Sequence, residues 1–413
     1  MYLFIFKSSA RGTHYGVGRY IVSLIQALLS FQDVHICEVC YHCHDCSCFY
    51  EEFVACNHIR LHIPDPVVSC IWDDAAEARY VEVIMFYLSA YVKNDEQTVF
   101  HLNSMNELFL ARALKDRYAF PLVAVIHSAC YQFLFETKPC HLQAIDIECP
   151  KDDVAYTLHS EKKFYETVHG IVSVTQYMRT FLQEEYHIGG KRIDVIHNSL
   201  DFHHHALDET SKSNLKASIG FGEKEKILLY VGRLDDSKGI AYLLEAFVAL
   251  TSYSDWRLIL AGEGDFQKYM PYAISQLGRV SFTGYLSQDT LRKLYAIADM
   301  GILPSLYDHS PYSLLEMVDY EIPLIVSDIP GPTEVFTGDI CKLIPMEVSD
   351  GGLCRPVVNE MKRLLAEGFE DEAWRHAAHD RYRVLRDKFH ISKMGEAYYR
   401  FYQRIMHEVP SST

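Results

Sequence analysis

The chain has 413 residues, of which 49% are hydrophobic, and its formal charge is -16 at pH 7. This length exceeds what one hydrophobic core usually supports, so two domains are expected. The apolar residues are spread along the chain, which excludes a disordered or fibrous protein. The negative charge opposes broad electrostatic binding of nucleic acid, so an anionic ligand would need a local cationic pocket.

No segment approaches the roughly 20 apolar residues that a membrane helix needs. Apolar residues follow Met1 with no basic region before them, which favours a first strand over a signal peptide. With twelve cysteines and no secretory signal, reduced thiols are expected. These features predict a cytoplasmic protein without a transmembrane segment, compatible with peripheral contact with a membrane.

Short β-rich runs alternate with longer helical patterns, which is typical of βαβ units and parallel sheets. The first series of expected strands is 3–6, 34–39, 59–63, 99–102, 122–126, 171–174 and 194–196. A polar stretch at 201–213, with three consecutive histidines, predicts a linker. The second series of strands is expected at 227–231, 257–261, 280–283, 300–303, 324–326 and 342–344, and helices are expected from Glu370 onward.

These elements predict an α/β protein of two tandem, doubly wound, Rossmann-like domains that face each other across a cleft. We expect the first domain at 1–200 and the second at 201–390. The last segment, 391–413, has an aromatic-rich apolar face. It is expected to be a helix that packs back on the first domain.

The run RGTHYGVGRYIVSLIQALL places Gly16 and Gly18 between the first strand and an amphipathic helix. Glycines at this point let the backbone approach a bound phosphate or sugar closely. The run lacks the third glycine of the dinucleotide-binding GxGxxG pattern and has no ribose-binding acid at the usual distance, which argues against a nicotinamide-dependent dehydrogenase. A plain tight turn is the structural alternative.

A cysteine cluster lies in and after the second expected strand, with His42 and His44 interleaved. CxxC spacing suits thiolate ligands of a metal or an iron–sulfur cluster. Cysteine is also a common small buried residue in strands, so a structural role without metal is favoured. A metal or redox module is kept as an alternative. The cluster consists of Cys37, Cys40, Cys43, Cys46 and Cys48.

His127 ends the expected strand PLVAVIH at its carboxyl end, where ligands bind in open α/β sheets. An imidazole that only caps the core is the alternative. In the second domain, ILLYVGRLDDSKGI places Arg233, Lys238 and Gly239 between a buried strand and a helix. Backbone N–H groups and the helix dipole favour an anion there, and the two cations would neutralise a diphosphate.

The downstream runs RLILAGEGD, VSFTGYLS, ADMGILPSLYDHSPYSLLEM and PLIVSDIPGPTEV follow in order. This series resembles the second domain of the family-4 retaining glycosyltransferases, whose fold is called GT-B. The resemblance is strongest from 226 to 335 and extends over the chain. It implies transfer of a sugar from a UDP- or GDP-sugar to a carbohydrate, lipid-linked or peptide acceptor in glycan biosynthesis, without a cofactor.

In that family two acidic residues with seven positions between them contact the donor, and Asp308 and Glu316 match them. The resemblance implies that Glu316 accepts hydrogen bonds from the ribose hydroxyls. The first acid is usually Glu, so Asp308 is shorter by one methylene. The family's glycine corresponds to Pro311, which has no N–H. The remaining contacts are then expected from Ser310, Tyr312, Ser313 and Leu314.

Three further segments match the family. Gly284 and Tyr285 match the residues beside the nucleobase, and His127 matches a histidine near the transferred sugar. Asn198 matches the asparagine of an Asn-Gly turn, although Ser199 replaces the glycine.

The implied mechanism is front-face substitution, in which the leaving diphosphate takes the proton of the acceptor. Arg233 and Lys238 would stabilise the leaving phosphate, with Asp308 near the donor sugar and His127 orienting a sugar hydroxyl. One alternative is an epimerase of the same fold, which would convert its substrate without an acceptor. Another is a nucleotide-sugar-binding, non-catalytic partner subunit, suggested by the departures from the family pattern at Asp308, Pro311 and Ser199.

Overall fold

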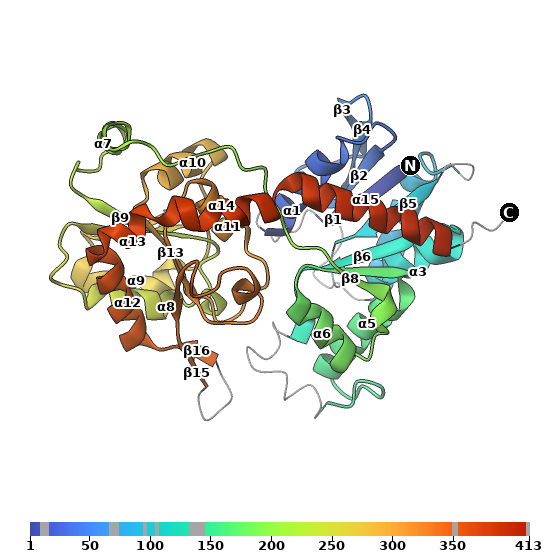
Figure 1. The fold of residues 1–413 in the computed structure, drawn as a ribbon. Helices are drawn as coiled ribbons and strands as arrows, with labels where there is room; N and C mark the ends of the chain where they lie inside the picture. Colours follow the sequence, from blue (N-terminus) through green and yellow to red (C-terminus); the bar gives the residue numbers. More distant parts are fainter. Residues whose placement is uncertain are drawn as a thin grey trace. The chain divides into compact units, whose positions relative to one another are not determined.

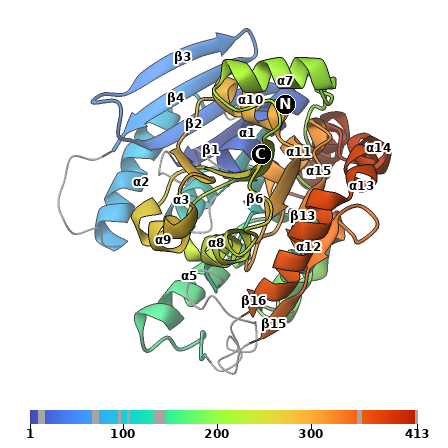
Figure 2. The ribbon, with the colours of Figure 1, turned by 90° about the vertical axis from the view of Figure 1, so that its left-hand side faces the viewer.

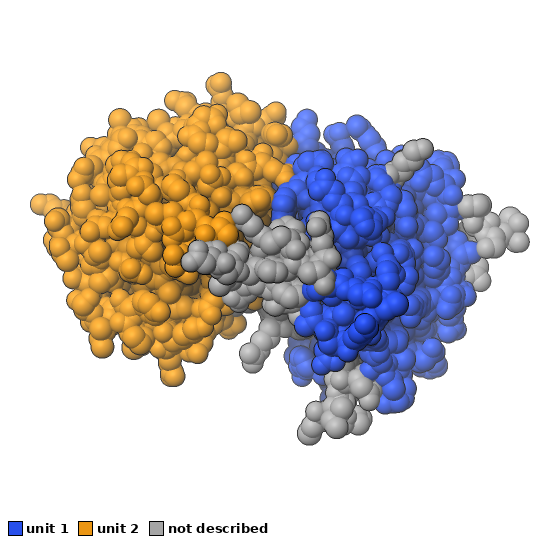
Figure 3. Space-filling model, turned by 90° about the horizontal axis from the view of Figure 1, so that it is seen from below, with its two compact units in different colours: residues 1–135, 139–199, 391–413 blue, residues 136–138, 200–390 orange. Residues whose placement is uncertain are grey.

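The computed structural model describes residues 1–8, 16–65, 74–93, 97–103, 107–131, 145–348 and 354–409. Contacts divide the chain into two compact units (Figure 3). Unit 1 takes in the described residues of 1–199 together with those of 391–409. Unit 2 takes in 200–390.

Unit 1 is built on an eight-stranded sheet (Figure 1). Its strands are β1 (Tyr2–Ser8), β2 (His35–Cys43), β3 (Tyr50–Ala55), β4 (His58–Pro64), β5 (Thr98–Leu102), β6 (Leu122–Ile126), β7 (Gly170–Ser173) and β8 (Ile193–Val195). They lie in the order β3-β4-β2-β1-β5-β6-β7-β8, and only β3 and β4 pair antiparallel. Its helices are α1 (Gly16–Leu28), α2 (Asp74–Leu88), α3 (Leu108–Arg117), α5 (Asp153–Thr167), α6 (Gln176–Glu184), η3 (Gly190–Arg192) and α15 (Ile391–Glu408).

The seven strands expected in this half correspond to β1, β2 and β4 to β8, so the parallel sheet is confirmed. Strand β3 was not predicted. Its sequence, YEEFVA, carries two adjacent carboxylates, and most of its residues are exposed. Such a pattern is tolerated because β3 is an edge strand that pairs only with β4.

The C-terminal helix α15 packs against α1 in unit 1 (Figure 1). The Tyr20 hydroxyl donates to the Tyr398 hydroxyl at 2.8 Å, and the Tyr402 hydroxyl lies 2.6 Å from His101 Nδ1. Burial lowers the pKa of His101 to about 4, so the imidazole in this contact is neutral near pH 7. No helix in the described part of the chain has both the length and the apolar character needed to cross a bilayer.

Unit 2 contains a six-stranded, fully parallel sheet with β9 (Lys226–Val231), β10 (Trp256–Ala261), β11 (Val280–Gly284), β12 (Met300–Leu303), β13 (Leu324–Ser327) and β14 (Lys342–Ile344). Their order, β11-β10-β9-β12-β13-β14, is that of a doubly wound dinucleotide-binding fold. All six strands were predicted. The chain reverses direction across the sheet between β9 and β12, which makes their carboxyl ends the expected ligand site.

Helices cover this sheet, and α8, α9 and α12 pack together over one part of it (Figure 2). The helices of unit 2 are α7 (Glu209–Ser218), η4 (Asp236–Lys238), α8 (Ile240–Val248), α9 (Phe266–Ala273), η5 (Ile274–Gln276), α10 (Gln288–Ile297), α11 (Tyr312–Asp319), η6 (Pro332–Glu334), α12 (Val358–Glu370), α13 (Glu372–His376) and α14 (Ala378–Lys388). A small antiparallel pair, β15 (Met346–Val348) and β16 (Cys354–Pro356), was not predicted.

The linker predicted over 201–213 is wrong in its second half, where helix α7 begins. The Asp208 side chain caps this helix by accepting the N–H of Ser211 at 3.0 Å. Lys216 then reaches Asp299 at 2.9 Å, so a polar helix is held by a buried ion pair. The stretch looked like a linker because this helix has few apolar residues.

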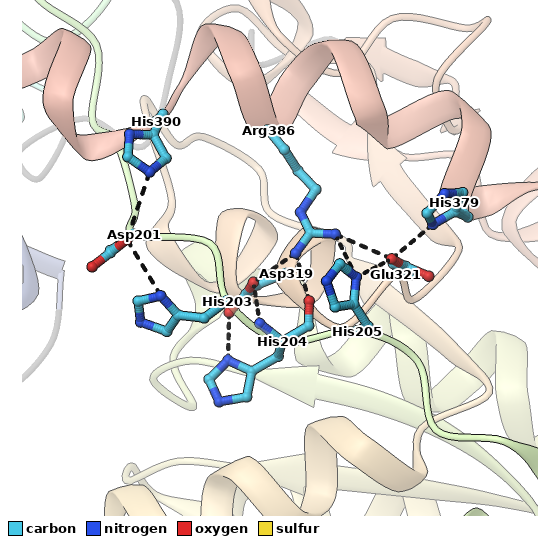
Figure 4. Close-up of polar contacts among 9 residues, drawn as sticks. All are labelled: Asp201, His203, His204, His205, Asp319, Glu321, His379, Arg386 and His390. Carbon is cyan, nitrogen blue, oxygen red and sulfur yellow. Dashed lines mark hydrogen bonds and ion pairs between the residues drawn. The ribbon is translucent and has the colours of Figure 1, made fainter.

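The first half of that stretch is held against the rest of unit 2 by a polar cluster (Figure 4). Arg386 of α14 lies 3.2 Å from Asp319 and 3.1 Å from Glu321. Burial acts to raise the pKa of Glu321, but hydrogen bonds from two histidines and the charge of Arg386 outweigh it, so this pKa is lowered. The histidine contacts are His204 to Asp319 at 2.6 Å, His205 and His379 to Glu321 at 2.9 and 2.8 Å, and His203 and His390 to Asp201 at 3.3 and 3.6 Å.

Candidate active site

Two loops meet where the strand order of unit 2 reverses. One loop leaves β9 and enters α8, and the other leaves β12 and enters α11. Because β9 and β12 are parallel neighbours, both loops emerge at the same edge of the sheet. The Leu306 N–H donates to the Ser237 carbonyl at 2.8 Å, which joins them directly.

Close backbone approaches in this site require glycine at two positions, one in the loop after β9 and one in the loop after β13. Gly239 has a φ of +67°, and a Cβ there would lie 2.0 Å from the Pro304 carbonyl oxygen. Gly331 has a φ of +96°, and its Cβ would lie 2.6 Å from the Asp308 carbonyl oxygen. Both glycines therefore allow backbone segments of the candidate site to approach each other closely. From the sequence alone, Gly239 was predicted only to lie in an anion-binding turn, and no role was predicted for Gly331.

The structure brings together two of the predicted site residues, Lys238 and Asp308. Lys238 Nζ lies 2.6 Å from Asp308 Oδ2, and both side chains are 16% exposed. The other carboxylate oxygen, Oδ1, accepts the backbone N–H of His309 at 2.9 Å. The carboxylate therefore fixes the direction of the lysine while leaving one side of the pair open to solvent.

Arg233 lies at the start of the same loop. Its Nη1 is 3.2 Å from Asp235, and its side chain is 43% exposed. The buried hydroxyl of Tyr230 donates to the Arg233 carbonyl at 2.6 Å, which fixes the backbone beneath the exposed guanidinium. Burial raises the pKa of Tyr230 well above its usual value, so this hydroxyl keeps its proton. The site thus presents two cations, one anchored and one reaching into solvent.

Helix α11 carries the second predicted acid. Glu316 is partly buried, and its Oε2 accepts the hydroxyl of Tyr295 at 2.7 Å. Before it, Ser310 and Ser313 are partly exposed, so their hydroxyls can reach a ligand. Tyr312 is buried, which limits its expected contact to the backbone.

The remaining predicted contacts of unit 2 differ in exposure. Leu314 is buried, and its N–H, expected to bind phosphate, donates to the Pro311 carbonyl at 3.2 Å. Gly284 ends β11 with a φ of +68°, and its carbonyl accepts the N–H of Gly262 at 3.1 Å. The next residue, Tyr285, is 57% exposed, as a ring available for stacking would be.

In unit 1, His127 follows β6 directly and is partly buried. Its ring meets that of Tyr20 edge-on, with the centroids 4.5 Å apart. The expected placement of Gly16 and Gly18 between strand and helix is wrong, because α1 already begins at Gly16 and Gly18 is buried within its first turn. Asn198 is buried near the end of the unit 1 segment.

Two family models match the chain. Residues 15–204 match "Glycosyltransferase Family 4", and residues 211–372 match "Glycosyl transferases group 1". Together the matches extend over most of the sequence and over both units. The chain belongs to the family-4 glycosyltransferases. Its class is therefore that of glycosyl-transferring enzymes, and neither a metal or redox module nor a non-catalytic subunit is favoured as its function.

Two relatives of this glycosyltransferase are each 26% identical to it over the parts that align. An uncharacterized glycosyltransferase of Methanocaldococcus jannaschii is 26% identical over 73% of this chain and 77% of its own length. Alpha-D-kanosaminyltransferase of Streptomyces kanamyceticus is 26% identical over 51% of this chain and 53% of its own length.

Solved structures confirm the GT-B fold of the glycosyltransferase. Sucrose-phosphate synthase from Thermosynechococcus elongatus has a TM-score of 0.74 at 16% identity, covering 99% of this chain and 100% of that one. Anabaena HepE in complex with UDP-glucose has a TM-score of 0.70 at 15% identity. This match covers 98% of this chain and 100% of that one. At these identities the likeness concerns the fold alone.

The structure adds a residue behind His127 that the sequence did not indicate. Glu161 of α5 is fully buried, and one of its oxygens accepts the N–H of Cys130 at 2.8 Å and the hydroxyl of Tyr165 at 2.6 Å. Its other oxygen accepts the hydroxyl of Tyr186. This carboxylate therefore anchors the segment that follows His127 in the glycosyltransferase. A single acid on the inner face of a helix was the only available signal.

The cysteine cluster does not form one site. Cys37 and Cys40 lie on strand β2, where residues three apart point to opposite faces of the sheet. Both side chains are buried, each on its own face of the sheet. A metal centre that uses both of these cysteines is therefore wrong. Cys48 is exposed beyond the end of the strand.

Proposed function

We propose that this glycosyltransferase uses a UDP- or GDP-sugar as donor and transfers the sugar with retention of anomeric configuration. The Lys238–Asp308 pair beside Arg233, at the point where the sheet order reverses, carries this proposal. A diphosphate there meets a guanidinium that can bind two oxygens and an ammonium held by a carboxylate. The helix N-terminus at Gly239 adds a favourable dipole.

The same assignment gives the nucleoside its contacts in unit 2. Glu316 accepts hydrogen bonds from the ribose, and Tyr285 stacks on the base. Ser310 and Ser313 bind the sugar or the β-phosphate through their hydroxyls. The structures of Anabaena HepE with UDP and with UDP-glucose support a nucleoside diphosphate as the ligand class. The roles of Leu314, Gly16, Gly18 and His127 stay predictions of the resemblance.

The proposed reaction needs no protein nucleophile and no cofactor. The bond from the anomeric carbon to the diphosphate oxygen breaks, and the acceptor oxygen bonds to the same face of that carbon. The acceptor proton moves to the departing phosphate oxygen. Arg233 and Lys238 lower the barrier by stabilising the negative charge that grows on this phosphate. Asp308 orients the lysine toward the donor.

The proposal also covers the acceptor class and the cellular location of the enzyme. A carbohydrate, lipid-linked or peptide acceptor is expected from the resemblance, and the enzyme is proposed to act in the cytoplasm, where nucleotide sugars serve as donors. Screening acceptors with the best-binding donor tests the first point. Cell fractionation with an antibody against the full chain tests the second.

The decisive experiment is calorimetric titration of UDP, GDP and their sugar derivatives into the wild-type protein and Arg233→Ala. A lost guanidinium–phosphate contact is worth about 1.5–3 kcal/mol, so Kd should rise about 10- to 150-fold. Arg363→Ala is the matched control, because it removes the same charge from an exposed surface pair on α12. The assignment would be refuted if the wild type bound none of these ligands. It would also be refuted if Arg233→Ala bound them as tightly as Arg363→Ala does. Product NMR at the anomeric carbon tests retention.

A further inference from the structure

The turn that follows β2 is held rigidly by one aspartate. The Asp65 N–H donates to the Cys43 carbonyl at 3.1 Å. Its carboxylate lies 2.7 Å from His42 Nδ1 and 3.1 Å from His44 Nδ1. The backbone on both sides of Cys43 is therefore fixed from the end of β4.

Three metal-ligating atoms gather on this turn. The sulfurs of Cys43 and Cys46 and a carboxylate oxygen of Asp45 all lie within 4.8 Å of one another. Cys43 is buried, Cys46 is partly exposed and Asp45 is exposed. The group therefore lies at the protein surface, with Cys43 as its innermost residue. In the described part of the chain, this is the one such group of three.

The spacing of these atoms is close to what a tetrahedral ion requires. Zinc binds thiolate at about 2.3 Å, which places two coordinating sulfurs about 3.8 Å apart. Starting from a separation of at most 4.8 Å, closure needs a movement of no more than about 1 Å. Two cysteines with two residues between them are also the usual ligand pair of small zinc sites.

We propose that Cys43, Asp45 and Cys46 bind a thiophilic divalent cation such as Zn²⁺, with a water molecule as the fourth ligand. Each thiol gives up its proton to solvent as the sulfur binds the ion. The site differs from the cluster first suggested by the sequence, because Cys37 and Cys40 take no part. It does not rest on the proposed donor site, which lies in the other unit.

The cation would stabilise one edge of the sheet of unit 1. Strand β3 pairs with β4 alone, and its residues are mostly exposed. The chain reaches β3 from β2 through the turn that carries the ligands. An ion bound to Cys43 and Cys46 therefore ties the entry of this edge strand to the end of a buried strand.

The test is titration of Co²⁺ into the reduced, full-length protein, followed by Zn²⁺. The wild type should bind one equivalent of Co²⁺ with a sulfur-to-cobalt charge-transfer band, which Zn²⁺ removes. Cys46→Ser should lose most of this band and bind at least tenfold more weakly. Cys56→Ser removes an exposed thiol after β3 and should match the wild type.

A second readout guards against loss of folding in the variant. Zn²⁺ should raise the Tm of the wild type and of Cys56→Ser but should leave that of Cys46→Ser unchanged. In the absence of metal, the circular dichroism spectrum of Cys46→Ser should match that of the wild type. No charge-transfer band in the wild type would overturn the proposal. Equal loss of the band in Cys46→Ser and Cys56→Ser would overturn it as well.

Discussion

Replacing Gly239 by alanine tests how the two loops of the candidate active site are held together. A residue other than glycine at a φ of +67° costs about 1–2 kcal/mol. The new Cβ would also start 2.0 Å from the Pro304 carbonyl oxygen, and overpacking of this kind costs about 1–3 kcal/mol. Together the two effects predict a loss of about 2–5 kcal/mol. For a unit of this size, a loss of 3 kcal/mol lowers Tm by about 6–12 °C.

The assays are differential scanning calorimetry and nucleotide titration on Gly239→Ala. Binding should weaken as well, because the clash separates the loops that carry Lys238 and Asp308. Gly278→Ala is the matched control, since a Cβ there meets nothing within 4 Å. It should not lower Tm, and the smaller entropy of the unfolded chain should raise Tm by about 1–4 °C. If Gly239→Ala melted within about 2 °C of the wild type, the inferred close approach of the loops would be refuted.

The other predictions concern buried polar contacts. Arg386→Ala leaves the carboxylates of Asp319 and Glu321 without their arginine, and urea unfolding should show a loss of about 3–5 kcal/mol. Because the folded-state pKa of Glu321 is lowered, its ionised form stabilises the protein at neutral pH, and this contribution disappears as pH falls through that pKa. Glu321→Gln should therefore lose stability at pH 7 and approach the wild type in strong acid, as urea unfolding across pH measures. Tyr398→Phe removes the acceptor of the Tyr20 hydroxyl, and thermal unfolding should show a loss of about 1 kcal/mol.

Matched variants keep these tests specific. Arg363→Ala removes an exposed arginine whose ion pairs should contribute less than about 1 kcal/mol. If Arg386→Ala were no more harmful than this, the buried cluster would not be stabilising the fold. A Glu321→Gln variant that stayed equally destabilised at every pH would contradict the titration of that carboxylate. No change in Tyr398→Phe would mean that water replaces the lost contact.

The sequence predicted the parallel strands because their apolar runs are local features. It also placed Lys238 and Asp308 at strand ends, and a doubly wound sheet brings such ends together. The need for glycine at 239 and 331 could not be predicted, since each faces a carbonyl from a distant loop. Glu161 was missed for the same reason, because two of its three partners, Cys130 and Tyr186, come from other segments.

Errors in the prediction arose where local composition misleads. The charged edge strand β3 and the polar helix α7 lack the apolar periodicity that signals an element. The cysteine spacing suggested one cluster, whereas the alternation of a strand separates Cys37 from Cys40. Only the turn after the strand brings two thiols to one side.

Unit 1 cannot finish folding before unit 2 has been synthesised, because helix α15 belongs to unit 1 but follows unit 2 in the chain. Tyr20 and Tyr398, which meet through their hydroxyls, are separated by 378 positions. At about 5–20 residues per second, a ribosome needs roughly 20 to 75 s to travel between them. During that interval α1 lacks the contact with α15, because all of unit 2 is synthesised first. The surface of α1 that packs on α15 therefore stays uncovered until the end of the chain has been synthesised.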